Sequence, residues 1–427
     1  MITSPVTFRA GAVLTGNPEC PLYSPGEVRI EHGRISYVGA PGRTGTGRIV
    51  DLPEGVVLPG LINAHQHAAM VLLRGYADDV RLMPWLHDHI WPVEARLGEE
   101  DVYVGTLLAC AEMIRSGTTA FLDMYMFPEA VARACEQAGI RVGIAWPLVG
   151  SLAEAAPRLE RLLELSQAWA GSDLVRPWLG PHAPYTCGED LLRRVAELSK
   201  EAGLRIHTHL SESVEEVDAL RRERGLTPIA YARETGILGA RTVVAHATVL
   251  DSDDVAILAD SGASVAHCPA SNLKLGNGVA PVRALVDRGV NVALGTDGAA
   301  STNTLDLFLE MRLAAWLQKS AAGDPSSFTA RDALTLATAG GARALDLETG
   351  ALAVGRPADL VALSTWASHL QPVHDPASAL VYAARPEDVR YTVMNGRIVL
   401  DDGIITTFDE EAVMHEARER ARRLVRG

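Results

Sequence analysis

Eight short apolar runs, separated by amphipathic helical stretches, limit what this chain can fold into more than any other feature. The runs lie at residues 57–64, 118–123, 142–148, 176–182, 204–209, 242–246, 263–267 and 290–297. Eight buried strands that alternate with helices are typical of a closed parallel (β/α)₈ barrel. A doubly wound open sheet is the rival, but it calls for a Gly-rich phosphate-binding turn after the first strand, and the sequence has none there.

The two ends of the chain have a different pattern. Period-2 alternation with turn residues between the runs predicts short antiparallel strands, for example at 27–31, 34–38, 358–363 and 391–400. Neither end is long enough to bury both faces of its strands alone. We therefore expect an α/β protein: a (β/α)₈ TIM barrel (58–350) inserted into a small β-sandwich domain. That domain combines residues 1–57 with residues 351–427, which include a terminal helix.

Composition and charge exclude several classes of protein. Hydrophobic residues make up 48% of the chain and charged residues 22%, which is ordinary for a globular enzyme and excludes a disordered chain. The formal net charge is −14 and there is no basic run, so we expect neither nucleic acid nor an anionic membrane surface as a partner. No stretch approaches the roughly 18 apolar residues of a membrane span, and the N-terminus lacks a signal pattern.

The five cysteines are an odd number and contain no C-x-x-C pair; they are Cys20, Cys110, Cys135, Cys187 and Cys268. This pattern argues against a disulfide framework and against a thiolate zinc site. It favours a reducing compartment, and we expect the protein in the cytoplasm.

Five of the eight predicted strands end in imidazoles or a carboxylate, in chain order His65 with His67, then His182, His209, His246 and Asp297. In a (β/α)₈ barrel the C-terminal ends of the strands form the rim of the active site. Five of the chain's 13 histidines would therefore meet at one place, which chance explains poorly.

This cluster has the composition of a metal site. His65 and His67 are two apart on a strand, so both side chains project from the same face. That pair alone fits two core histidines bonded to the backbone equally well. Adding His209 and Asp297 favours a metal, because three imidazoles and one carboxylate suit Zn²⁺, although Fe²⁺ and Ni²⁺ accept the same ligands.

Two further residues near the fifth strand are ambiguous. From its position alone, Glu212 fits a solvated acid at a helix start better than a group that reaches a substrate. His207 lies two residues before His209 on the same strand face, one layer deeper, and we interpret it as a packing residue.

Four sequence motifs carry a resemblance to a known family: LPGLINAHQH at 58–67, HTHLSE at 207–212, VAHA at 244–247 and GTDG at 295–298. With them the chain resembles the amidohydrolase superfamily. Four more segments make it similar to the ring-aminohydrolase branch, closest to the 5-methylthioadenosine/S-adenosylhomocysteine deaminases. These are MPWL at 83–86, WPVE at 91–94, GPHAPY at 180–185 and HCPASN at 267–272. The resemblance runs nearly end to end.

The resemblance implies a role for each matching residue. The ligands of the metal would be His65, His67, His209 and Asp297. Glu212 would protonate the ring nitrogen and the leaving ammonia, His246 would orient the attacking water, and Asp297 would take its proton. Because His182 stands where two-metal relatives carry a bridging lysine, a single ion is expected.

The resemblance also implies a substrate pocket. Glu94 would accept both ribose hydroxyls, Trp85 would flank the nucleoside, and His182, Glu212 and Asp297 would face the substrate. Arg158 is a candidate for one of the arginines with which relatives hold the carboxylate of S-adenosylhomocysteine, and a solvated helix face fits it equally well. The other arginine has no match.

The resulting prediction is a metal-dependent hydrolytic deaminase of an adenine nucleoside, which forms the inosine analogue and ammonia. The candidate substrates are 5′-methylthioadenosine, S-adenosylhomocysteine and adenosine. The resemblance suggests a homo-oligomer. In an alternative, the protein is still a metal-dependent deaminase or hydrolase, but its substrate is another heterocycle: guanine, 8-oxoguanine, cytosine, a pterin or a triazine. Such a substrate would have no ribose for Glu94 to bind. A remote alternative is a non-catalytic scaffold on the same fold, which we would expect to have lost its ligands. A zinc cytidine-deaminase fold is excluded because its P-C-x-x-C pair is missing.

Overall fold

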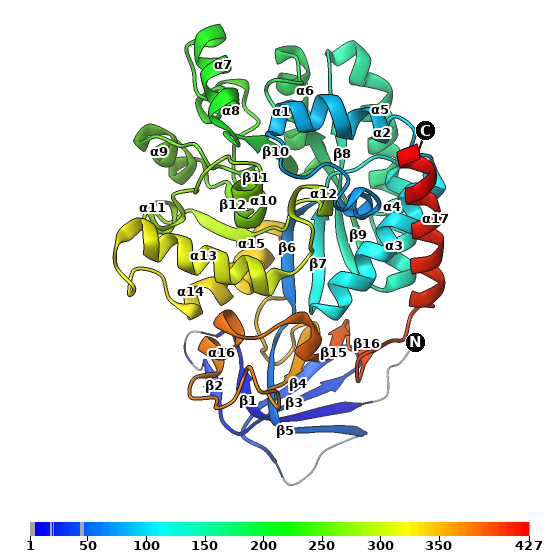
Figure 1. The fold of residues 1–427 in the computed structure, drawn as a ribbon, viewed down its shortest axis with the longest axis vertical. Coiled ribbons are helices and arrows are strands. Elements are labelled where there is room, and N and C mark those ends of the chain that lie inside the picture. The colour runs from blue at the N-terminus through cyan, green and yellow to red at the C-terminus, as the bar shows by residue number, and fades with distance from the viewer. Residues whose placement is uncertain (1–4, 18, 20, 43–46, 427) are drawn as a thin grey trace.

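The computed structural model describes residues 5–17, 19, 21–42 and 47–426, and it contains a parallel barrel above a mixed sheet (Figure 1). The barrel strands follow each other in chain order: β6 (Leu61–Gln66), β7 (Thr118–Asp123), β8 (Arg141–Leu148), β9 (Val175–Pro181), β10 (Ile206–Leu210), β11 (Thr242–His246), β12 (Ser264–His267) and β13 (Asn291–Leu294). The amide of Asp297, just beyond β13, donates a hydrogen bond of 3.0 Å to the carbonyl oxygen of His65 on β6. This bond joins the last strand to the first, and the predicted barrel is confirmed.

The first predicted strand divides into two elements. Residues 57–59 end β5 (Arg48–Pro59), which belongs to the mixed sheet, and β6 starts at Leu61. Gly60 lies between them, and a Cβ atom there would come within 2.2 Å of the Thr119 hydroxyl oxygen. The apolar run continues across this junction because both sides of it are buried, so periodicity alone could not locate the break.

Helices surround the barrel as the alternating pattern predicts (Figure 1). The longer ones are α3 (Glu99–Arg115), α4 (Pro128–Ala138), α5 (Leu152–Ala168), α6 (Glu189–Ala202), α7 (Val214–Arg224), α8 (Pro228–Thr235), α9 (Ser252–Ser261) and α13 (Leu307–Ala322). In α6, Leu191, Leu192 and Val195 are fully buried, and Gly203 with a φ of 70° ends the helix. Burying each such side chain contributes roughly 1.5–3 kcal/mol.

Both ends of the chain build one nine-stranded mixed sheet, as expected. Its order is β17 (Ile404–Ile405), β16 (Arg397–Asp401), β15 (Val389–Met394), β14 (Leu360–Ser364), β5, β1 (Val6–Leu14), β3 (Gly26–Glu31) and β4 (Arg34–Gly39), with β2 (Leu22–Tyr23) paired to β1. Phe8 on β1 and Tyr391 on β15 have ring centroids only 5.7 Å apart. In a flat sheet, strands three positions apart would be separated by about 14 Å, so the sheet curls over a shared core, in keeping with the sandwich expectation.

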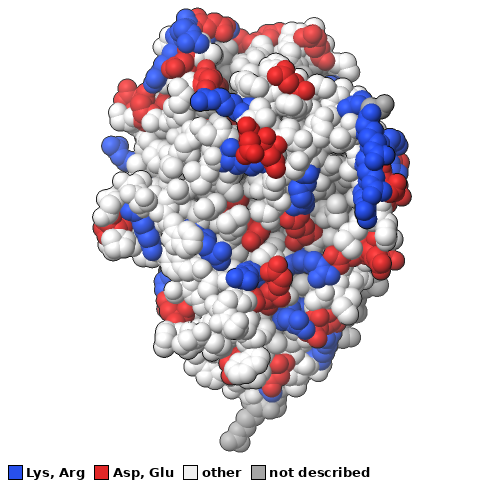
Figure 2. Space-filling model, in the orientation of Figure 1, with Lys and Arg blue, Asp and Glu red and all other residues white. Residues whose placement is uncertain are grey.

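The last helix, α17 (Glu410–Arg426), returns to the barrel. Arg420 and Arg423 bond the buried carboxylate of Asp101, so α17 lies against α3 although we expect residues 351–427 to belong to the β-domain. The division into 1–57, 58–350 and 351–427 remains our proposal. Basic and acidic side chains are interspersed on the face in Figure 2, where a dense basic strip covers α17.

Two further observations concern sequence-based expectations. Within the described ranges, no helix is both long enough and apolar enough to cross a lipid bilayer. Four cysteines, Cys110, Cys135, Cys187 and Cys268, are buried with free thiols, and Cys20 lies outside the described residues.

One long excursion separates β6 from α3. We refer to residues 67–98 as the β6–α3 segment; it contains η1 (Ala68–Leu73), α1 (Leu82–Pro84), η2 (Trp85–Ile90) and α2 (Trp91–Glu94). Lys274 of α10 (Pro269–Lys274) holds this segment through an ion pair of 2.7 Å with Asp78. The segment crosses the C-terminal end of the barrel (Figure 1). Several of its residues, including Met70, Leu82 and Trp91, line the cavity there.

Candidate active site

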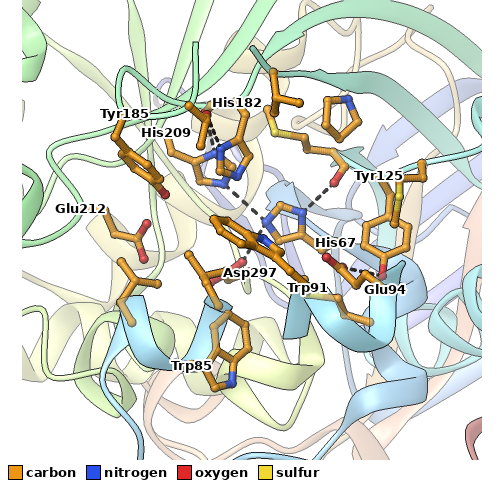
Figure 3. A pocket seen from close by; sticks show the side chains of 18 of the residues that line it. His67, Trp85, Trp91, Glu94, Tyr125, His182, Tyr185, His209, Glu212 and Asp297 are labelled. Carbon is orange, nitrogen blue, oxygen red and sulfur yellow. Dashed lines mark hydrogen bonds and ion pairs between the residues drawn. The ribbon is translucent and has the colours of Figure 1, made fainter. Parts of the chain in front are cut away.

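A cavity of about 480 Å³ lies at the C-terminal end of the barrel strands (Figure 3). Nine of the ten residues expected in the site line it: His67, Trp85, Glu94, Arg158, His182, His209, Glu212, His246 and Asp297. The tenth, His65, is completely buried next to them. Residues from seven different parts of the chain therefore converge at the place that the strand ends predict.

The four residues implied as metal ligands come together. Nε2 of His67 lies 3.3 Å from Oδ1 of Asp297 and 3.4 Å from Nε2 of His209. Nε2 of His65 lies 3.5 Å from the same carboxylate oxygen. Three imidazole nitrogens and one carboxylate oxygen thus point at a common centre.

In His67 and His209, the hydrogen bond made by Nδ1 determines which ring nitrogen has a free lone pair. Nδ1 of His67 is 2.7 Å from the carbonyl oxygen of Met124, and Nδ1 of His209 is 2.9 Å from that of His182. A carbonyl oxygen can only accept, so each Nδ1 carries the hydrogen. In the neutral imidazole, Nε2 then keeps its lone pair and is available to a metal.

His65 is oriented by a second histidine. Nδ1 of His207 lies 3.0 Å from the carbonyl oxygen of Val243, so Nε2 of His207 must accept, and it lies 2.8 Å from Nδ1 of His65. Nε2 of His65 is left buried without a hydrogen-bond partner. His207 does not face the common centre, as expected, but it is more than a packing residue because it fixes the tautomer of His65.

The charges of the cluster suit a divalent cation. Burial lowers the pKa of His65 to about 3 and holds the pKa of His209 well below its ordinary value, so both imidazoles are neutral at pH 7. Asp297 accepts hydrogen bonds from the Ser271 and Ser301 hydroxyls at 2.6 and 2.8 Å, which favour its ionised form. Neutral imidazoles together with one carboxylate form a donor set that Zn²⁺ prefers, and Nε2 of His65 is buried among them without a partner.

Backbone strain is concentrated at these strand ends. Ser211, His246, Ala247 and Asp297 have φ values of 54°, 70°, 47° and 61°, in the left-handed region that favours glycine. Each such residue costs of order 1–3 kcal/mol and persists where the surroundings fix it, most often at functional sites. These residues lie at or just beyond the ends of β10, β11 and β13, and two of them, His246 and Asp297, line the cavity.

Glu212 is buried, and its position-based interpretation as a solvated acid is wrong. Its side chain is only 6% exposed, and α7 starts two residues later. Burial first, and then the charge of Asp297, raises the pKa of Glu212 to about 8, so the carboxyl group is mostly protonated at pH 7. The Asn277 amide donates to its Oε1 at 3.1 Å, and Oε2 lies 3.7 Å from Nε2 of His246.

His246 is fixed in the same way as the other histidines. Its Nδ1 lies 2.9 Å from Oδ1 of Asn272, an oxygen that can only accept, so Nε2 keeps its lone pair and faces the cavity. Its nitrogen also lies within 4.8 Å of the ligand atoms of His65 and His209. His246 therefore stands between the metal donors and Glu212.

A second acid supports the turn that carries Glu212. The buried carboxylate of Glu216 accepts hydrogen bonds from the amides of Ser211 and Glu212 at 3.2 and 2.7 Å. Its neighbour Glu215 is exposed and pairs with Arg81. Two adjacent glutamates at the start of α7 thus have opposite environments, which the sequence alone does not distinguish.

The opposite wall of the cavity comes from the β6–α3 segment. Trp85 and Glu94 both line the cavity, and Trp85 is 4% exposed. The hydroxyl of Tyr125 donates a hydrogen bond of 2.8 Å to Oε1 of Glu94. Burial raises the pKa of Glu94 to about 7, although the bond from Tyr125 opposes that shift.

Arg158 and His182 lie elsewhere on the cavity wall. Arg158 is on the first turns of α5, and its guanidinium donates to the carbonyl oxygen of Pro147 at 3.1 Å. Among the described residues it is the only Lys or Arg that lines the cavity. His182 is held through its Nδ1, 2.9 Å from the Thr186 hydroxyl.

Sequence reasoning missed residues that position the others. Tyr125, Asn272 and Asn277 contact Glu94, His246 and Glu212. Tyr125 could have been found, because it follows β7 by two residues and the rule that polar residues at strand ends form the rim applies to it. Asn277 lies in a loop with no such signal.

Comparisons with known proteins agree with this arrangement. The model of the Amidohydrolase family matches residues 56–399. A 5-methylthioadenosine/S-adenosylhomocysteine deaminase of Syntrophobacter fumaroxidans is 46% identical, over 96% of each chain. A 5′-deoxyadenosine deaminase of Methanothermobacter thermautotrophicus is 43% identical, over 99% of this chain and 98% of the relative.

A solved structure is similar over nearly the whole length. The crystal structure of an adenosine deaminase from Xanthomonas campestris with bound zinc has a TM-score of 0.95 and 36% sequence identity, and 99% of each chain is covered. The family match includes all eight barrel strands and the strand ends that form the cluster. This chain therefore belongs to the amidohydrolase family.

Proposed function

We propose that this protein is a metal-dependent aminohydrolase that deaminates an adenine nucleoside to the inosine analogue and ammonia. One observation carries the proposal: a single cavity contains a set of metal-type donors, the protonated carboxyl group of Glu212 and, on the opposite wall, the carboxylate of Glu94. The relatives named as deaminases of adenine nucleosides support the same reaction.

We assign the metal ligands to His65, His67, His209 and Asp297, and we propose one Zn²⁺ ion. A divalent ion held there would supply Lewis acidity, which lowers the pKa of water from 15.7 toward about 7. Fe²⁺ and Ni²⁺ accept the same donors. The zinc bound to the Xanthomonas campestris adenosine deaminase supports the choice of ion.

Three side chains then handle protons. An aromatic amidine resists attack until its ring nitrogen is protonated, and Glu212 holds a proton at neutral pH because burial raises its pKa to about 8. His246 presents an acceptor nitrogen that can orient the attacking water, and Asp297 can take a proton from it. As the water attacks, Glu212 delivers its proton to the ring nitrogen and Asp297 takes one proton of the water. The Glu212 carboxylate then carries the proton of the new hydroxyl group to the amino group, which leaves as ammonia, and the proton held by Asp297 restores Glu212.

The nucleoside end of the cavity is assigned to the β6–α3 segment. Glu94 would accept the two ribose hydroxyls, Trp85 would flank the nucleoside, and His182 would line the far wall. Met126, Pro147 and Val149 are among the apolar residues that line the cavity, and Arg158 contacts the carbonyl oxygen of Pro147. This lining favours an uncharged 5′ substituent such as hydroxyl, methylthio or hydrogen. Among the described residues that line the cavity, only the guanidinium of Arg158 could pair with the negative charge of a 5′ tail.

We further propose that the protein acts in the cytoplasm as a homo-oligomer. Four free thiols support a reducing compartment. The oligomeric state rests on resemblance and is measurable by light scattering.

A panel of substrates tests the function. Adenosine, 5′-methylthioadenosine, 5′-deoxyadenosine and S-adenosylhomocysteine would be compared with adenine, guanine, cytosine, a pterin and an aminotriazine, with ammonia release as the measurement. We expect the nucleosides to be deaminated and adenine to be much poorer. Preference for a free base would contradict the assignment of Glu94 and favour another ring.

A further inference from the structure

The hydroxyl of Tyr125 makes the only hydrogen bond to the carboxylate of Glu94 within the described part of the chain. The distance to Oε1 is 2.8 Å, with the phenol as the donor and the carboxylate oxygen as the acceptor. The side chain of Tyr125 is almost completely buried. Figure 3 shows the tyrosine and the glutamate pointing at each other at the edge of the cavity.

The two partners come from different segments, and that of Tyr125 is tied to the metal cluster. The residue before it, Met124, donates its amide hydrogen to the carbonyl oxygen of Gln66 at 2.9 Å. The carbonyl oxygen of Met124 accepts from Nδ1 of His67 at 2.7 Å. Tyr125 is therefore fixed relative to a proposed metal ligand, whereas Glu94 lies on the long β6–α3 segment, which has no strand in it.

The chemistry of diol recognition explains why this contact matters. Two vicinal hydroxyls need two acceptor oxygens at a defined angle. If the carboxylate side chain adopts another rotamer, at most one of its oxygens faces the two hydroxyls. A neutral carboxyl group would also present a hydrogen where an acceptor is needed. A hydrogen bond to Oε1 restricts the rotation of the carboxylate and favours its ionised form, while Oε2 and the second lone pair of Oε1 stay available.

We propose that Tyr125 is a positioning residue that determines nucleoside specificity by holding the Glu94 carboxylate in the orientation that accepts both ribose hydroxyls. The inference rests on the proposed nucleoside deaminase function and goes beyond it. Burial and the neighbouring Glu94 hold the pKa of Tyr125 well above its ordinary value, so the phenol remains a donor throughout the working pH range.

The test compares Tyr125→Phe with the wild-type protein on two substrates that differ only in the ribose hydroxyls. For adenosine, we expect KM to rise about tenfold and kcat to stay within about twofold, since a hydrogen bond to a charged group is lost. For 2′,3′-dideoxyadenosine, both parameters should be unchanged. Tyr103→Phe is the matched control, because it removes a surface hydroxyl that bonds Gln137.

A double variant separates positioning from general packing. If Tyr125 acts through Glu94, then adding Tyr125→Phe to Glu94→Ala should cause no further loss on adenosine. Equal losses on both substrates, or additive losses in the double variant, would overturn the inference while leaving the deaminase function intact. Failure of the wild-type protein to release ammonia from any adenine nucleoside would overturn the proposed function, and the inference with it.

Discussion

The two walls of the cavity are built in different ways. The metal-type cluster stands on strand ends that the barrel fixes, and each of its imidazoles has its outer nitrogen bonded to a carbonyl or to His207. The opposite wall stands on the β6–α3 segment, which is held by Lys274 and by Tyr125. The comparison indicates that the barrel fixes the proposed reaction centre, whereas the proposed substrate wall rests on a few side-chain contacts and is the part that can vary. Five predictions test this contrast, and the largest effect is expected at the cluster.

Removal of a proposed metal ligand should abolish activity. His65→Ala or His209→Ala leaves three donors, so we expect protein with little bound metal and no measurable deamination. Metal analysis and ammonia release check both parts. Asp297→Asn should keep some metal but lose turnover, because an amide cannot take a proton from water. His415→Ala, an exposed histidine on α17, is the control; wild-type turnover by Asp297→Asn would refute the proton-acceptor role.

The next effect should be a loss of kcat at the acid. Glu212→Gln keeps size and hydrogen bonding but cannot deliver a proton, so kcat should fall about 10²–10⁴-fold while metal and nucleoside still bind. Steady-state kinetics and a binding assay measure the two quantities. Glu215→Gln is the matched control, since that side chain is exposed. An equal loss in both variants would show that Glu212 is not the acid.

On the substrate wall the loss should appear in KM. Glu94→Ala removes the two proposed charge-assisted hydrogen bonds, each contributing about 1.5–3 kcal/mol, so KM for adenosine should rise by at least about 10²-fold. A 2′,3′-dideoxy analogue offers nothing to this carboxylate and should be scarcely affected. Comparing kcat/KM between the two substrates cancels a general folding defect. Equal damage to both would favour a free-base or pterin ring.

A pH effect should follow from the same carboxylate. Burial raises the pKa of Glu94 to about 7, and the ionised form, which predominates above that pH, is the one that we propose accepts the diol. As pH falls through 7, kcat/KM for adenosine should therefore decrease, by about tenfold between one and two pH units below the pKa. The ratio of kcat/KM for adenosine to that for the dideoxy analogue isolates this titration. A ratio that is constant from pH 5 to 8 would contradict the assigned role.

The sequence predicted the cluster better than the substrate wall, for a physical reason. A strand end in a closed barrel has one possible location, so His209 or Asp297 could be placed from the pattern of apolar runs. Residues outside strands have no such constraint. Burial of Glu212 depends on Asn277 and on the turn held by Glu216, which come from loops and a helix start, and no periodicity reports either contact. The contact between Tyr125 and Glu94 and the tautomer of His65 likewise became visible only in three dimensions.

The smallest effect is expected at Arg158, which lines the cavity where we propose that the 5′ end of a substrate lies. Its guanidinium is exposed and already donates to the carbonyl oxygen of Pro147, so its contribution to binding is screened by water. Arg158→Ala should lower kcat/KM for S-adenosylhomocysteine about two- to fivefold, since one exposed ion pair is worth roughly 1 kcal/mol or less. It should leave 5′-methylthioadenosine unchanged. Arg161→Ala, on the same helix and paired with Glu129 and Glu164, is the control. A loss on 5′-methylthioadenosine equal to that on S-adenosylhomocysteine would mean that Arg158 supports α5 rather than a charged tail, and the variable wall would then end at the ribose.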